Sequence, residues 1–291
     1  MLVIYFLLAV LPPISIVYYV YSQDLYEKEP RKILVISFLF GCLITLPAAI
    51  IESKISVLII SNLFLYAFIG VAFVEEGLKF VVLKFYSYKR PDFNEPYDGI
   101  VYSVCISLGF ATVENIGYVF GEEGYELITG IGRTFSAIPL HASCGIIMGY
   151  YLGISKFSKN KYIFIIKGLG YAVLIHGFYD YFLFEGSYIV FSFICLLIAV
   201  YFSKKAITLH QKNSPFNKSN KITNQRPEKI KIIKSSVLFE INEDDSLIAL
   251  IKKYKYADKH NRSLILNHLE NKKETNSKYF DLLQLIYNNK L

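Results

Sequence analysis

The sequence is poor in charged residues and in cysteine. Asp, Glu, Lys and Arg make up 19% of its 291 residues, whereas 54% are hydrophobic and the mean hydropathy is +0.38. This composition excludes an ordinary soluble domain. The cysteines Cys42, Cys105, Cys144 and Cys195 lie in separate apolar segments and form no Cys-x-x-Cys pair, so we interpret them as small packing residues. We therefore expect a polytopic membrane protein.

The first apolar segment lacks the features of a signal peptide. It has no positively charged start and no small-residue cleavage site, so we interpret it as an uncleaved first span. A spanning helix needs about 20 apolar residues. On this measure the sequence predicts an all-α bundle of about seven transmembrane helices, at residues 2–21, 33–51, 59–85, 97–120, 133–154, 162–184 and 188–202. We expect Pro12, Pro13 and Pro47 to kink the first two helices without ending them.

Positive charges alternate between the predicted loops. The loops after the first, third and fifth helices each contain several Lys or Arg residues, and the intervening loops contain almost none. Lys and Arg concentrate in the cytoplasmic loops of membrane proteins. We therefore predict a multi-pass protein of the cell membrane with its N-terminus outside and its C-terminal tail in the cytosol.

The composition changes sharply at Lys204. Residues 1–203 carry 13 Lys and Arg and 15 Asp and Glu, whereas residues 204–291 carry 18 and 9. We predict a membrane domain at 1–203, a flexible linker at 204–228 and a small cytosolic helical tail at 229–291. The basic tail favours contact with anionic lipid or the cytosol over nucleic acid, and its partner stays open.

Polar side chains fall within four consecutive predicted helices, although a charge at bilayer depth costs roughly 2.5 kcal/mol or more. They are Glu75, Glu76 and Lys79 in the third helix, Glu114 and Asn115 in the fourth, His141 in the fifth, and His176 and Asp180 in the sixth. The first, second and seventh predicted helices carry no ionisable group at depth. This distribution predicts one shared polar cavity.

The spacing of these residues supports a common site. Lys79 follows Glu75 by four residues and Glu76 by three, so its ammonium group can neutralise either carboxylate. Asp180 follows His176 by four residues and can orient the imidazole. We expect the site in the outer half of the bundle or near its midplane, since several members lie six to eight residues from the outer helix ends. The alternative to a catalytic site is a purely structural role. Glu75 and Glu76 would then form a buried ion pair with Lys79, and Glu114 and Asn115 would form interhelical hydrogen bonds.

Carboxyl and imidazole groups in an apolar site suit peptide hydrolysis. A desolvated carboxyl group can act as a general base near neutral pH, and imidazoles can stabilise an oxyanion or bind a metal. No Ser or Cys stands in an obvious nucleophile–base arrangement, which disfavours an acyl-enzyme. There is no His-Glu-x-x-His helix. Metal-free glutamate catalysis and hydrolysis assisted by a divalent metal such as zinc, held by Glu76, His141 and His176, both stay open, with the former slightly favoured.

Four motifs on successive helices resemble those of the PrsW intramembrane proteases, distant relatives of the CAAX prenyl endopeptidases. The motifs are Glu75-Glu76-x-x-Lys79, Phe110-Ala-Thr-Val-Glu114-Asn115, His141 followed by Gly149, and His176-x-x-x-Asp180. The resemblance covers residues 1–203, and the tail departs from the family's short pattern.

The resemblance implies an endopeptidase that cuts a single-pass membrane protein, such as an anti-sigma factor in a stress-signalling cascade, near the extracytoplasmic side. It implies catalytic roles for Glu75, Glu76, His141 and His176. We expect supporting roles for Lys79, Phe110, Glu114, Asn115 and Asp180.

A proton-coupled transporter or channel is the alternative function, because the same Glu, His and Asp side chains could form a proton relay. Transporters usually contain internal repeats, and none is visible in this sequence. A non-catalytic scaffold would leave the intramembrane carboxylates unexplained. The sequence therefore favours a protease.

Overall fold

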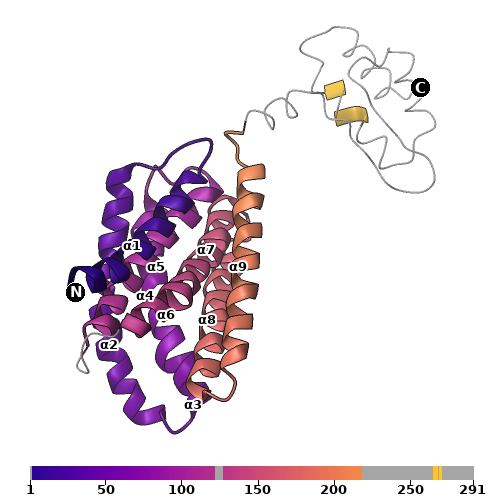
Figure 1. The fold of residues 1–291 in the computed structure, drawn as a ribbon. Helices are drawn as coiled ribbons and strands as arrows, with labels where there is room; N and C mark the ends of the chain where they lie inside the picture. The colour runs from indigo at the N-terminus through magenta and orange to yellow at the C-terminus, as the bar shows by residue number, and fades with distance from the viewer. Residues whose placement is uncertain (1, 122–126, 218–264, 268, 271–291) are drawn as a thin grey trace. The chain divides into compact units, whose positions relative to one another are not determined.

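The computed structural model describes residues 2–121, 127–217, 265–267, 269 and 270, and residues up to Asn217 form a compact unit of their own. The helices of this unit pack side by side as a bundle (Figure 1). They are α1 (Leu2–Ser22), α2 (Arg31–Ile59), α3 (Leu63–Leu65), the π-helical η1 (Tyr66–Ala72), α4 (Phe73–Phe85), the short 3₁₀ turn η2 (Ser87–Lys89), α5 (Pro96–Val119), α6 (Leu127–Phe135), α7 (Ala137–Phe157), α8 (Lys161–Glu185) and α9 (Ile189–Lys212).

The chain is an all-α polytopic membrane bundle, as predicted. Six helical segments of the described part are long and apolar enough to cross a membrane, with α6 and α7 counted together. α1 continues through Pro12 and Pro13, and α2 continues through Pro47. The third predicted helix corresponds to α3, η1 and α4, which follow one another without a break over residues 63–85. A π-helical turn inside a helix frequently marks a functional site.

Four predicted segments have clearly different boundaries in the structure. The second, 33–51, extends to Ile59 in α2, and the third, 59–85, begins only at Leu63. The fifth, 133–154, is divided at Ser136, where φ is −126° and ψ is −78°, so Arg133 belongs to α6 and not to α7. The seventh extends through Lys204 to Lys212 in α9, so the first residues of the predicted linker are helical. The predicted tail, 229–291, lies almost entirely outside the described residues.

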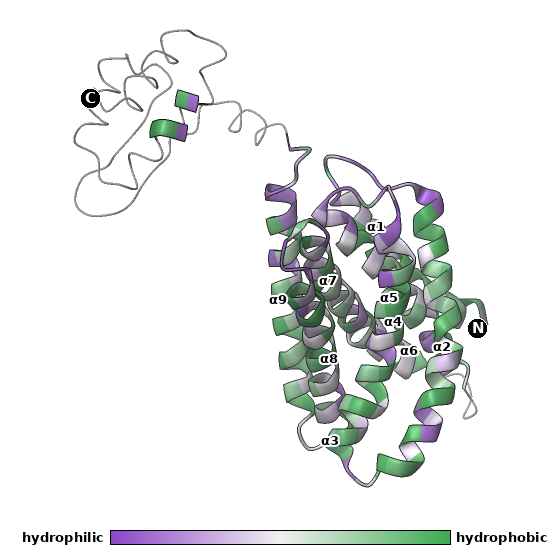
Figure 2. Ribbon diagram, turned by 180° about the vertical axis from the view of Figure 1, so that it is seen from behind, coloured by the Kyte–Doolittle hydropathy of each residue, from purple (hydrophilic) through white to green (hydrophobic). Residues whose placement is uncertain are grey.

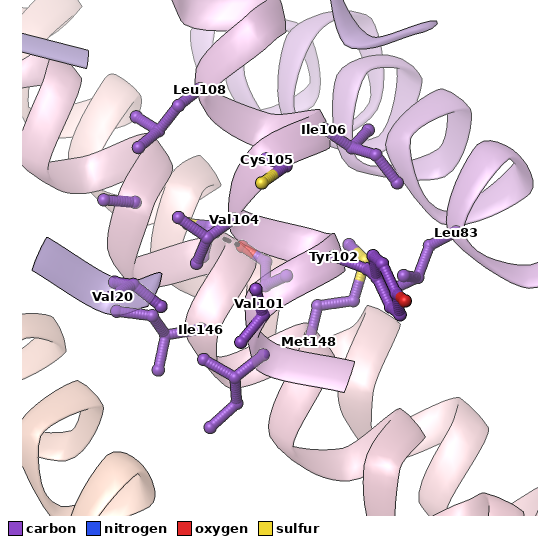
Figure 3. Close-up of a cluster of buried hydrophobic side chains, with 14 of the residues drawn as sticks. Val20, Leu83, Val101, Tyr102, Val104, Cys105, Ile106, Leu108, Ile146 and Met148 are labelled. Carbon is purple, nitrogen blue, oxygen red and sulfur yellow. Dashed lines mark hydrogen bonds between the residues drawn. The ribbon is translucent and has the colours of Figure 1, made fainter. Parts of the chain in front are cut away.

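α5 is the central helix, and glycines bring its neighbours close. A methyl group added to Gly99 of α5 would collide with the carbonyl oxygen of Gly149 in α7, and one added to Gly41 of α2 would collide with that of Ile106 in α5. Small residues allow such backbone approach between membrane helices. Figure 3 shows the apolar side chains of α5 packed among Val20, Leu83, Ile146 and Met148 from the surrounding helices.

The outward faces of the peripheral helices are apolar. Exposed large hydrophobic side chains follow one another along α8 and α9. In Figure 2, much of the α9 ribbon is coloured green, for hydrophobic residues. Buried polar side chains gather instead inside the bundle, on α4, α5, α7 and α8. An apolar exterior around a polar interior is the arrangement expected of helices surrounded by lipid.

Candidate active site

The Lys79 ammonium group lies at the centre of the buried polar cluster. Its Nζ is 3.0 Å from Oε2 of Glu75, 2.8 Å from Oε1 of Glu76 and 3.0 Å from Nδ1 of His141, and it lies 4.2 Å from the centroid of the Phe110 ring. An ammonium group has three protons to donate. Three acceptors therefore satisfy it completely, and Nδ1 of His141 must accept.

The first turn of α4 carries both glutamates, and α8 supplies the residues that face Glu76. Nδ1 of His176 is 3.0 Å from Oε1 of Glu76, and its Nε2 is 3.3 Å from Oδ2 of Asp180. Both ring nitrogens of His176 thus face carboxylate oxygens, an arrangement that favours the imidazolium form. α8 can approach because the Phe68 ring of η1 packs on Gly177, where a side chain would collide with it.

A second chain of contacts runs from His141 to α6. Nε2 of His141 is 2.8 Å from Oε2 of Glu114, whose Oε1 is 3.0 Å from Nη2 of Arg133. Nε of Arg133 donates to Oδ1 of Asn115 at 3.0 Å, and the Asn115 amide donates to the carbonyl oxygen of Ala9 at 3.3 Å. α1, α5, α6 and α7 are therefore joined through one polar network.

A cavity of about 590 Å³ opens beside these groups. Its wall includes charged or ionisable side chains from six α-helices and apolar side chains such as Leu46, Val71 and Phe184. The polar lining residues include Glu52, Glu75, Glu114, Arg133, His141, His176 and Asp180. Glu76 is fully buried and does not line the cavity. A peptide segment entering the cavity would therefore meet Glu75 before Glu76.

The structure brings together all nine residues predicted for the site, and it adds two more. Arg133 was predicted only as the start of a helix, yet it contacts both Glu114 and Asn115. Glu52 lines the cavity because α2 continues to Ile59, which corrects the prediction that the second helix carries no ionisable group at depth. The sequence feature that could have indicated a role for Arg133 in the site is its positive charge beside an otherwise apolar run.

The ligand atoms needed for a metal ion converge in the same cluster. One side-chain atom from each of Glu75, Glu76, His141 and His176 lies within 4.8 Å of the others, and all four residues are buried. Oε2 of Glu76 is buried without a hydrogen-bond partner. Carboxylate oxygens and imidazole nitrogens are ligands that zinc accepts. These residue types fit a divalent ion, which would have to displace the Lys79 ammonium group and a proton of His176 from the ligand atoms that they now occupy.

Comparisons with known proteins show which family the sequence resembles. Residues 29–203 match the family described as "PrsW family intramembrane metalloprotease". The chain is 38% identical over 176 residues to Protease PrsW of Geobacillus kaustophilus, which covers 60% of this chain and 77% of the relative. It is 34% identical over 201 residues to Protease PrsW of Shouchella clausii, an alignment that covers 67% of this chain and 91% of the relative. It is 36% identical over 175 residues to Protease PrsW of Bacillus subtilis, which covers 59% of this chain and 79% of the relative. No solved structure matches.

Proposed function

The chain belongs to the PrsW family of intramembrane proteases, and from this premise we propose how its buried Glu and His side chains hydrolyse a peptide bond. The observation that carries the proposal is the position of Glu75. Its carboxylate lines the cavity and is at the same time held by Lys79 at 3.0 Å. A fixed carboxylate at the wall of a cavity can position and deprotonate a water molecule.

Glu75 acts as the general base in this proposal. It takes one proton from a water molecule while the water oxygen bonds to the carbonyl carbon of the substrate. The proton then passes to the amide nitrogen as the carbon–nitrogen bond breaks, which leaves a carboxyl and an amino terminus. Lys79 contacts Glu75, and the imidazolium of His176 contacts the adjacent Glu76, so both place positive charge near the point where negative charge develops on the carbonyl oxygen.

Glu76, Glu114, Asn115 and Asp180 hold the catalytic groups in place. Glu76 contacts both Lys79 and His176 from the fully buried side of the cluster. Glu114 contacts His141, whose other nitrogen faces Lys79, so the imidazole is held at both ends. Groups locked in this way need little reorganisation during the reaction, which favours catalysis.

A divalent ion such as zinc, held by Glu76, His141 and His176, would polarise water or the substrate carbonyl when bound. Metal analysis of the purified protein distinguishes this form of the proposal from metal-free glutamate catalysis. The metal form requires bound metal in the wild-type protein and its loss in His141→Gln/His176→Gln. Full cleavage by a preparation without bound metal would support the metal-free form.

The proposed substrate is a single-pass membrane protein, such as an anti-sigma factor, cut near the extracytoplasmic side. Two observations support this placement. Glu114 lies near the C-terminal end of α5, and the Lys-rich and Arg-rich loops lie at the opposite ends of the helices. Because basic loops favour the cytosol, the cavity would open toward the outer half of the membrane.

Comparison of membrane proteomes tests the function. Cells with the wild-type protein should release a fragment of at least one single-pass protein, and cells with Glu75→Gln/Glu76→Gln should not. Glu185→Gln is a matched control, because Glu185 is an exposed carboxylate at the end of α8 that does not line the cavity. Equal cleavage by the double variant would overturn the proposal, and proton-gradient-driven flux without cleavage would favour transport.

A further inference from the structure

A second group of carboxylates lies at the other end of the bundle from the active site. Glu27 and Glu29 belong to the segment between α1 and α2, and Asp98 lies in the first turn of α5. One oxygen from each of the three lies within 4.8 Å of the others. Asp98 precedes Glu114 by 16 residues on α5, which is roughly 24 Å along the helix. The group is therefore separate from the catalytic cluster.

Two of these carboxylates are almost fully buried, and each has an oxygen without a partner. Glu29 is 2% exposed and Asp98 is 0% exposed. Oε1 of Glu29, Oδ1 of Asp98 and Oε2 of Glu27 are buried and accept no hydrogen bond. A buried carboxylate oxygen without a partner carries a desolvation cost that proteins rarely leave uncompensated.

The other carboxylate oxygens of Glu29 and Asp98 accept hydrogen bonds. Oδ2 of Asp98 accepts the backbone N–H groups of Asn94 and Glu95, each at 2.7 Å, and Oε2 of Glu29 accepts the Tyr102 hydroxyl. These bonds fix both carboxylates and direct them toward a shared region. Each of these two carboxylates is therefore held in place by one oxygen, while its second oxygen has no hydrogen-bond partner.

The three carboxylates lack a direct ion-pair partner in the described part of the chain. None of them forms an ion pair with a Lys, Arg or His of the part of the chain that the structure describes. The nearby Lys28 donates to the carbonyl oxygen of Tyr21 at 2.8 Å, and Lys156 donates to that of Tyr88 at 2.7 Å.

We propose that Glu27, Glu29 and Asp98 form a binding site for a hard divalent cation, Mg²⁺ or Ca²⁺. Both ions prefer oxygen ligands, and carboxylates of this kind are their usual protein ligands. Glu27 is only partly buried, so the ion can enter past it and keep water ligands on that side. The bound ion joins the α1–α2 segment to the start of α5, and thereby stabilises the bundle.

Thermal unfolding of the purified full chain tests the site, with MgCl₂ and CaCl₂ in separate arms. A specific site should raise the unfolding temperature by about 5–10 °C when the cation reaches roughly 100 times its dissociation constant. The arm that responds identifies the ion. Glu27→Gln/Glu29→Gln should lose the response, and Asp92→Asn, which changes a neighbouring carboxylate outside the group, should keep it.

A second measurement tests the site even if the double variant fails to fold. Tb³⁺, a luminescent substitute for Ca²⁺, can be excited through tyrosine in this protein, which has no tryptophan and places Tyr102 against Glu29. Mg²⁺ or Ca²⁺ should displace Tb³⁺, and the mild variant Glu27→Gln alone should weaken its binding. The proposal is overturned if neither cation shifts unfolding nor displaces Tb³⁺ up to roughly 10 mM, above the weakest range of protein Ca²⁺ sites, or if Glu27→Gln/Glu29→Gln keeps the full response.

Discussion

Nδ1 of His176 lies 3.0 Å from Oε1 of Glu76, although 100 residues separate the two in the chain. Both side chains are buried, and the contact joins the start of α4 to the middle of α8. His176 also faces Asp180, so a single imidazole lies between two carboxylates. Changes at this site are therefore expected to alter the charge balance inside the bundle as well as the reaction.

Replacement of Lys79 by Met should lower the free energy of unfolding. The substitution leaves the Glu75 and Glu76 carboxylates buried without their common cation. Removing one partner of a buried ion pair costs about 3–5 kcal/mol of folding free energy. Unfolding of the variant in detergent should show a loss of this size.

The double variant Lys79→Met/Glu76→Gln is the control for this explanation. Because Gln removes one of the two uncompensated charges, the double variant should be more stable than Lys79→Met alone. A double-mutant cycle measures the coupling. Strictly additive losses would contradict a charge-balance role for Lys79.

The sequence was sufficient to predict the bundle and nine of the residues that meet inside it, but not Arg133 or Glu52. Long apolar runs fix the helices, and a charge within such a run needs a partner. It could not predict the division at Ser136, because the apolar pattern continues across it and only the backbone angles show the break. For the same reason the contacts of Arg133 were missed. The π-helical turn before Glu75 leaves no mark in the hydrophobic pattern.

The Asp180→Asn variant should cleave more slowly while it binds substrate almost unchanged. Oδ2 of Asp180 lies 3.3 Å from Nε2 of His176. Loss of the Asp180 charge removes one of the two carboxylates that orient the imidazole and stabilise its protonated form. Groups that orient a catalytic side chain typically contribute 10- to 100-fold, so we expect kcat to fall by roughly that factor. Separate measurement of kcat and KM on a reporter substrate tests this, and an increase in KM alone would contradict it.

The Arg133→Lys variant should lose activity although it keeps the positive charge. Arg133 uses Nη2 for Glu114 and Nε for Asn115, each at 3.0 Å, and a single ammonium group on a shorter reach cannot reproduce both contacts in the same geometry. We expect a loss of about 1–3 kcal/mol in unfolding free energy, because one buried polar group is left unpaired. Cleavage and unfolding measured together should both decline. Full activity of the Lys variant would show that charge alone is required at this position.

The Gly149→Ala variant should disrupt the contact between α5 and α7. A methyl group at Gly149 would meet the backbone of Gly99 and Ile100, which cannot move aside as a flexible side chain could. Overpacking of this kind costs typically about 1–3 kcal/mol. Gly170→Ala in α8 is the matched control, because no atom lies within 4 Å of the position its methyl group would take. Alanine is the better helix former by about 1 kcal/mol, so this variant should be as stable as the wild type or more so. Equal effects of the two substitutions in thermal unfolding would show that close packing at Gly149 is not what the bundle requires.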